Sequence, residues 1–200
     1  MQIQKESIER LLCYLYHIES KISNKIQRKK LILRDIAVIE LLFATGLRIS
    51  ELCGLKNKEF TIDDGILCIK GKGAKERYLQ VENKEVLKTL KRYKVEFQNE
   101  IECVGYFFVN RYGKKFSEQS ARRMIDKHAQ AASLDQHITP HMFRHSFATL
   151  LLEEDVDIRY IQKMLGHSSI ITTQIYTYVT SEKQKQILRT KHPRNKMRIN

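Results

Sequence analysis

The chain has 200 residues, 42% of them hydrophobic, which is enough to bury one globular core. Its 36 Lys and Arg residues against 23 Asp and Glu give a formal charge of +13, so a polyanion such as nucleic acid would relieve the self-repulsion of a compact fold. No secretory leader and no run of 18 apolar residues occurs, so the sequence predicts neither secretion nor a membrane span, and we expect a cytoplasmic location.

The hydrophobic pattern predicts a mainly α fold with one small antiparallel β-sheet, an α+β domain. Short β-prone runs in residues 59–82, separated by an Asp-Gly turn and a glycine-rich tip, predict a three-stranded meander. The basic stretch 23–30 predicts a loop, and Thr45-Gly46 interrupts a helix. In chain order we predict helices over 5–22, 34–44 and 48–55, strands over 60–62, 66–69 and 78–81, helices over 84–99, 117–132, 139–153, 157–165 and 170–178, a short extended segment at 106–110, and a tail from 181 that begins as a helix.

The four cysteines are widely spaced and form no CxxC pair, which predicts reduced thiols in a cytosolic protein. Of the four, Cys53 and Cys68 are expected to be small core residues. The others are Cys13 and Cys103.

Arg48 and Glu51 lie three residues apart in a predicted helix, so both project from one face. A structural ion pair is one interpretation. The turn at Gly46 favours another, because it would deliver Arg48 to the start of a helix, where a guanidinium fork is a good phosphate clamp.

His141 and Arg144 are also three residues apart. Thr139 can cap their helix and Pro140 suits its first turn, so both side chains would lie near the positive helix end, where a phosphate oxygen can bind.

His141 and His145 have the HxxxH spacing of a zinc site. Zinc catalysis would need a third protein ligand and an acidic general base beside the first histidine, and Met142 occupies that place. We therefore expect no metal, and we expect His145 to be a buried, hydrogen-bonded helix residue.

Gly166 is a natural helix C-cap that would present His167 from a turn, and Tyr176 follows nine residues after His167. Tyr178 lies about 200° around a helix from Tyr176, so only one of the two can face a given pocket. Taken singly, a turn histidine is usually a surface residue and a tyrosine usually a packing residue.

Lys72 stands between two glycines at the tip of the predicted hairpin. The tip is either a solvated hairpin or a finger that reaches a DNA groove. Lys70, Lys75 and Arg77 nearby form a basic ribbon suited to contacts with the DNA backbone.

The order of these residues resembles the tyrosine recombinase (phage integrase) family, in particular its bacterial Xer type and the integrases of mobile elements. The resemblance runs from about Ile8 to Pro193. It is carried by Ala44-Thr45-Gly46-Leu47-Arg48-Ile49-Ser50-Glu51-Leu52, Lys72 in a hairpin, His141-x-x-Arg144, Leu165-Gly166-His167 and Tyr176. It implies the tyrosine recombinase catalytic-domain fold.

The resemblance also implies the chemistry. Tyr176 would attack the scissile phosphate and hold a 3′-phosphotyrosyl link, with Lys72 as general acid for the leaving 5′ oxygen. His141 would assist proton transfer at the tyrosine or orient the phosphate. The covalent link stores the phosphodiester, so neither ATP nor a metal or other cofactor is implied.

A second group of residues would bind the phosphate. Arg48, Arg144 and His167 would hold its non-bridging oxygens and stabilise the extra negative charge of the transition state. Glu51 would support the pocket by fixing Arg48 and His141 from behind.

For partners, the resemblance implies double-stranded DNA and a tetramer on two DNA sites. Residues 1–180 would form the catalytic domain, and the C-terminal segment 181–200 would pack in trans on a neighbouring protomer. Larger relatives have a separate N-terminal domain, so we expect either a catalytic fragment or a minimal recombinase. Two other functions stay open: relaxation of DNA by a type IB topoisomerase, and DNA-binding regulation without catalysis.

Overall fold

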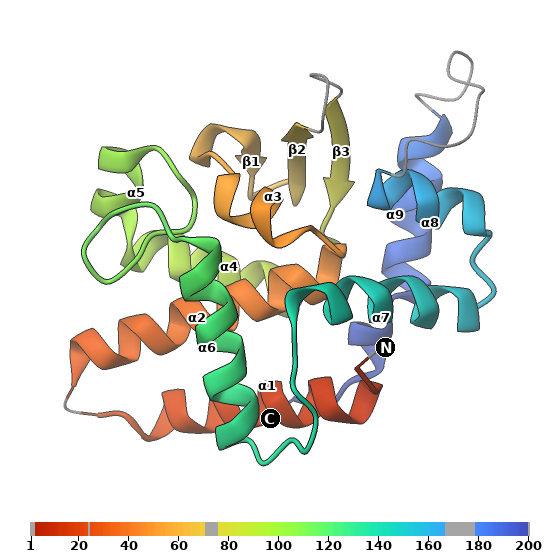
Figure 1. The fold of residues 1–200 in the computed structure, drawn as a ribbon. Helices are drawn as coiled ribbons and strands as arrows, with labels where there is room; N and C mark the ends of the chain where they lie inside the picture. Colours follow the sequence, from red (N-terminus) through yellow and green to blue (C-terminus); the bar gives the residue numbers. More distant parts are fainter. Residues whose placement is uncertain (1–2, 24, 71–75, 167–178, 200) are drawn as a thin grey trace.

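The computed structural model describes residues 3–23, 25–70, 76–166 and 179–199, which form a mainly helical domain with one small antiparallel sheet (Figure 1). The predicted fold class is therefore confirmed. The elements are α1 (Lys5–Lys21), α2 (Ile26–Thr45), α3 (Ile49–Gly54), η1 (Asn57–Glu59), β1 (Phe60–Thr61), β2 (Ile66–Lys70), β3 (Glu76–Gln80), α4 (Lys84–Glu96), α5 (Gln98–Val104), α6 (Glu118–Ala131), α7 (Pro140–Glu153), α8 (Ile158–Leu165), α9 (Val179–Lys191) and η3 (Pro193–Lys196).

Helix α2 runs through the middle of the core. Every residue from Ile32 to Thr45 is buried, and α1, α4 and α7 pack against the helix. A helix surrounded by protein must satisfy its polar side chains internally. Asp35 does so by accepting hydrogen bonds from Arg34 at 2.6 Å and pairing with His128 at 2.9 Å.

The sheet has the order β1-β2-β3, with Phe60 opposite Leu67 and Leu67 opposite Leu79. These three side chains are buried, so the sheet covers the core with one face. Figure 1 shows the sheet beside α3, with α8 and α9 beyond β3. The strands agree with the predicted meander to within two residues, and the hairpin tip at 71–75 lies outside the described residues.

Two predicted boundaries were wrong. The basic stretch 23–30 is not a loop throughout, because α2 begins at Ile26; arginine and lysine are good helix formers, and Lys30 packs over the Phe97 ring. The predicted helix 84–99 is two helices, since the backbone leaves the helical conformation at Phe97. The predicted helix 170–178 lies entirely outside the described residues and stays a prediction.

The two cysteines predicted to be core residues differ. Cys53 is buried, as predicted, and burial raises the pKa of its thiol to about 12. The prediction for Cys68 was wrong. It is only half-buried, because Leu67 and Ile69 take the inner face of β2 and the strand alternates.

The C-terminal segment docks on its own chain. His192 is buried between the rings of Phe43 and Phe147, with ring centroids 5.4 and 5.6 Å away, and burial lowers the pKa of its imidazole to about 4. Arg194 donates to both carboxylate oxygens of Glu40, at 2.9 and 2.7 Å. Packing of this segment in trans on a neighbouring protomer stays a prediction.

Within the described residues, no helix has both the length and the apolar content that a membrane span requires.

The Arg194–Glu40 pair yields a stability prediction. Glu40 is fully buried, so Arg194→Met leaves a charge in the core without its cation and should lower the free energy of unfolding by about 3–5 kcal/mol, measured by urea denaturation. Arg189→Met is the matched control, because Arg189 pairs with Glu82 at the surface; it should change stability by about 1 kcal/mol or less. Equal effects of the two substitutions would contradict this account.

Candidate active site

Arg48 stands at the start of α3, as the sequence predicts. Its backbone N–H donates to Glu51 Oε2 at 2.9 Å, and its Nη1 donates to Glu51 Oε1 at 3.1 Å. The Arg48 side chain is still 42% exposed, whereas that of Glu51 is 9% exposed. The helix start therefore holds the carboxylate inside and leaves part of the guanidinium fork open to a ligand.

Gly46 forms the turn that leads to Arg48. It ends α2 in the left-handed conformation, with φ of 63°, which residues other than glycine seldom adopt. A Cβ atom here would lie 2.7 Å from Phe147 of α7 and 2.9 Å from Leu165 of α8. The absence of a side chain at Gly46 therefore allows α2, α7 and α8 to pack together at this residue.

Arg144 of α7 is buried beside this turn. It donates to the carbonyl oxygens of Gly46 at 2.8 Å and Leu165 at 2.6 Å. No carboxylate among the described residues forms an ion pair with it. Burial, together with the charge of Arg48, lowers the pKa of Arg144 to about 10, so the group remains a cation at neutral pH. A buried cation whose hydrogen bonds among the described residues go to backbone carbonyls can attract an anionic ligand.

Arg77 of β3 completes the cluster, although its residue type and its place near the hairpin tip suggested a DNA-backbone contact. Its Nη1 and Nη2 donate to the two oxygens of Glu51 at 2.9 and 2.8 Å, and its Nε donates to the carbonyl oxygen of Met164 at 3.0 Å. Burial raises the pKa of Glu51, but the hydrogen bonds from Arg77 and Arg48 outweigh that effect, and the pKa is lowered. Glu51 is therefore an anion at neutral pH.

The buried position of Arg77 was not predicted, because the basic residues of the ribbon cannot be distinguished from one another by residue type. A signal was available in the strand alternation: Arg77 and the buried Leu79 share one face of β3, while Glu76 and Tyr78 are exposed on the other. Lys70 has the solvent position expected of the ribbon, with a 58% exposed side chain that pairs with Glu59 at 3.4 Å.

His141 and His145 are both exposed on α7, so the prediction of a buried His145 was wrong. The core face of the helix is formed by Phe143 and Phe147, and residues four apart share one face, which leaves both histidines outside. Glu51 makes no hydrogen bond to His141 within the described part of the chain. Nor do three potential metal ligands cluster anywhere among those residues.

The remaining predicted site residues, Lys72, Lys75, His167 and Tyr176, lie outside the described residues, as does Tyr178. The described end of α8 nevertheless lies beside the cluster. Gly166 ends α8 in the left-handed conformation, as predicted, and a Cβ there would lie 3.0 Å from the Arg77 side chain.

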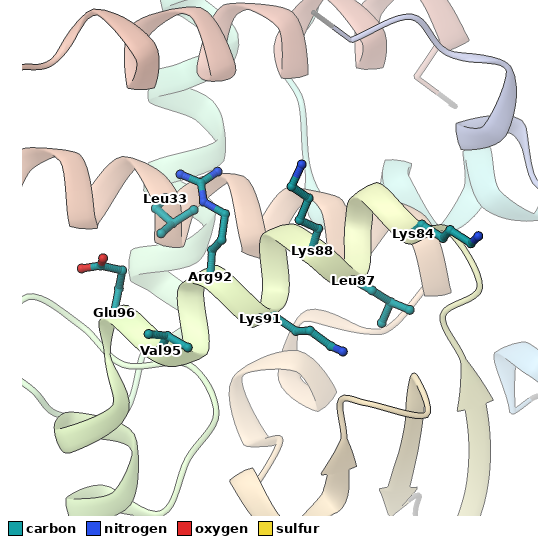
Figure 2. Close-up of a pocket in the computed structure, with 8 residues that line it drawn as sticks. All are labelled: Leu33, Lys84, Leu87, Lys88, Lys91, Arg92, Val95 and Glu96. Carbon is teal, nitrogen blue, oxygen red and sulfur yellow. The ribbon is translucent and has the colours of Figure 1, made fainter.

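A groove of about 590 Å³ on the outer face of α4 is separate from this cluster. Figure 2 shows lysine, arginine and glutamate side chains around apolar ones. The lining residues, none of which belongs to the arginine cluster, are Leu33, Lys84, Leu87, Lys88, Lys91, Arg92, Val95 and Glu96.

Comparison with known proteins identifies the family. Residues 14–183 match the model of the Phage integrase family. The chain belongs to this family. A tyrosine recombinase of Agathobacter rectalis is 56% identical to it over 187 residues, which are 94% of this chain and 61% of that protein. Tyrosine recombinase XerD of Chlorobaculum tepidum is 43% identical over 165 residues, which are 81% and 54% of the two chains.

Solved structures agree with this assignment. The crystal structure of XerA recombinase matches with a TM-score of 0.71 and 27% identity, over 93% of this chain and 64% of that one. XerH bound to its difH substrate in a pre-cleavage complex matches with a TM-score of 0.70 and 26% identity, over 94% and 49%. This phage integrase family member thus spans between half and two thirds of the length of the curated relatives it matches.

Gly46 gives a prediction specific to the site of this integrase-family chain. Gly46→Ala introduces the φ strain and a clash with Phe147, whereas Gly105→Ala introduces similar strain, at φ of 74°, with open space around the new methyl group. We expect Gly105→Ala to cost about 1–2 kcal/mol and Gly46→Ala about 1–3 kcal/mol more, measured by thermal unfolding. A Gly46 variant as stable as the Gly105 variant would show that the three helices can separate at no cost.

Proposed function

We propose that the protein is a site-specific DNA recombinase that cleaves and rejoins strands through a covalent bond to Tyr176. The observation that carries the proposal is the pairing of a half-open Arg48 fork with a buried Arg144 that lacks a carboxylate partner among the described residues. Both are anchored at the Gly46 turn, and such an arrangement suits a phosphate better than a solvated surface does. Membership of the phage integrase family and relatives named tyrosine recombinase support it.

In the proposed reaction the Tyr176 oxygen attacks the scissile phosphorus and the bond to the 5′ oxygen breaks. The DNA then carries a 3′-phosphotyrosyl link, and Lys72 supplies the proton that makes the leaving group a 5′-hydroxyl. His141 receives the phenol proton or orients the phosphate. The 5′-hydroxyl of a partner strand reverses the step, so the phosphodiester energy is conserved and ATP is not consumed.

The described cluster would act on the phosphate itself. Arg48 and Arg144, with His167, would hold the non-bridging oxygens while the phosphorus carries extra negative charge. Glu51 keeps the Arg48 fork in one orientation, and the backbone carbonyls keep Arg144 in another. Donors that are already oriented need no reorganisation when the charge develops.

Double-stranded DNA is the proposed partner, since the formal charge of +13 favours binding a polyanion. Exposed Lys70, with Lys75 and Lys72 of the hairpin, would contact the DNA. We further propose a tetramer on two DNA sites, with the C-terminal segment contacting a neighbour, and action in the cytoplasm.

The covalent step can be tested with nicked suicide duplexes that carry inverted repeats taken from the DNA beside the gene. In EDTA, the wild-type protein should form a protein–DNA adduct that survives denaturing electrophoresis. Tyr176→Phe should form none because it lacks the nucleophilic oxygen, and Tyr178→Phe, the matched control, should form it normally. An adduct that persists in Tyr176→Phe, or one that requires Mg²⁺, would contradict the proposed reaction.

A second experiment separates a recombinase from a topoisomerase. Two labelled duplexes bearing the same site are incubated with the protein, together with a supercoiled plasmid that lacks it. Joined products containing one strand from each duplex are expected, because the liberated 5′-hydroxyl can attack a partner's phosphotyrosine. Relaxation of the site-free plasmid without strand exchange would instead indicate a type IB topoisomerase.

A further inference from the structure

Arg77 joins three separate parts of the fold through one guanidinium group. Arg77 lies in β3, donates hydrogen bonds to both carboxylate oxygens of Glu51 in α3, and donates another to the carbonyl oxygen of Met164 in α8. All three of its nitrogens donate to these partners, and only 14% of the side chain is exposed. These bonds use three of its five N–H donors, and the low exposure leaves little of the group accessible to a DNA phosphate.

We propose that Arg77 is a positioning residue for strand cleavage: it holds Arg48 and the chain leading to His167 in one rigid unit and does not bind the DNA backbone. The proposal rests on the proposed recombinase function. It also replaces the interpretation of Arg77 as one member of a basic DNA-binding ribbon.

Glu51 is shared between two arginines. This carboxylate accepts from Arg48 and from Arg77, and the bidentate geometry with Arg77 sets its plane. Arg48 is left with one bond from Nη1 and a side chain that is 42% exposed. Without Arg77, the bonds that described residues donate to the buried Glu51 would come from Arg48 alone, and the carboxylate could turn and draw the Arg48 fork away from a ligand.

The end of α8 is held by two arginines. Arg77 holds the carbonyl oxygen of Met164, and Arg144 holds the next one, that of Leu165. Gly166 packs directly on the Arg77 guanidinium, and a Cβ atom there would lie only 3.0 Å from it. The next residue in the chain is His167. Two arginines thus anchor two successive peptide groups immediately before a proposed phosphate ligand.

Strand β3 is the third element that Arg77 fixes. Lys72, the proposed general acid, precedes Arg77 by five residues in the sequence. The hydrogen bonds of Arg77 attach β3 to α3 and α8 through one side chain. Displacements of about 1 Å in such constellations can slow a reaction about 100-fold.

Arg77→Lys is the informative variant, because it keeps the positive charge and a long side chain but loses the planar fork. With suicide duplex at saturation, we expect the single-turnover rate of adduct formation to fall about 30- to 100-fold. The dissociation constant for DNA should stay within about twofold, and the slope of its logarithm against log salt should not change, since no phosphate contact is lost. Arg10→Lys, the same exchange at an exposed position of α1, should leave both quantities unchanged.

A double-mutant cycle gives the second readout. Because Arg77 acts through Glu51, Arg77→Lys should slow cleavage much less when Glu51→Gln is already present. Thermal unfolding of each variant checks that it is folded under the assay conditions, and Arg77→Gln repeats the measurement with the charge removed.

Two results would overturn the inference. One is wild-type cleavage by Arg77→Lys at saturating DNA; the other is weaker DNA binding with a salt slope shallower by about one, which indicates a lost phosphate contact. Failure of the wild-type protein to form an adduct would instead refute the proposed function, so the two failures are distinguishable.

Discussion

Gathering several guanidinium groups in one place requires a fixed anion among them, and Glu51 supplies it. Its carboxylate is nearly buried and is ionised because Arg77 and Arg48 donate to it. A buried charge with good hydrogen-bond geometry is stable only while its partners stay in place, so the pair is a constraint on the fold as well as an interaction. The positions of α3, β3 and α8 around the cluster all depend on it.

The turn at Gly46 provides the second half of the framework. Its missing side chain allows α2, α7 and α8 to come together, and its carbonyl oxygen is one of the two that hold Arg144. The consequence is an asymmetry between the two site arginines. Arg48 is bound by a carboxylate and half-open, whereas Arg144 is bound by carbonyl dipoles and buried. Their combination gives a site that is positively charged and already oriented before a ligand arrives.

The C-terminal segment packs against α2 and α7. Arg194 and Glu40 form a buried pair, and Tyr16 of α1 donates to the same carboxylate at 3.0 Å. Neutral His192 fills the space between two phenylalanine rings, one from α2 and one from α7. The helix that carries Arg144 is therefore packed against the end of the chain as well as against α2.

Much of this protein could be predicted from the order of its residues. Hydrophobic periodicity gave the helices and the meander, because the spacing of apolar residues matches each element's geometry. The motif from Gly46 to Glu51 and the pair His141 and Arg144 predicted a site, and the Gly166 cap was placed correctly, since such signals are local in the chain. The start of α2 within the basic stretch 23–30 was missed although the helix propensity of arginine and lysine favours it, and the break at Phe97 could not be predicted, because packing of this buried ring decides it.

Only the tertiary structure decided which groups pair with the charged side chains. The sequence shows Lys70 and Arg77 as similar members of one basic ribbon, but the fold exposes the first and buries the second against Glu51. Likewise His145 was expected to be buried, and only the packing of α7 shows that it lies outside together with His141. A charge takes its role from the groups that surround it after folding, and these come from distant segments: Arg77 and Met164 are more than 80 residues apart.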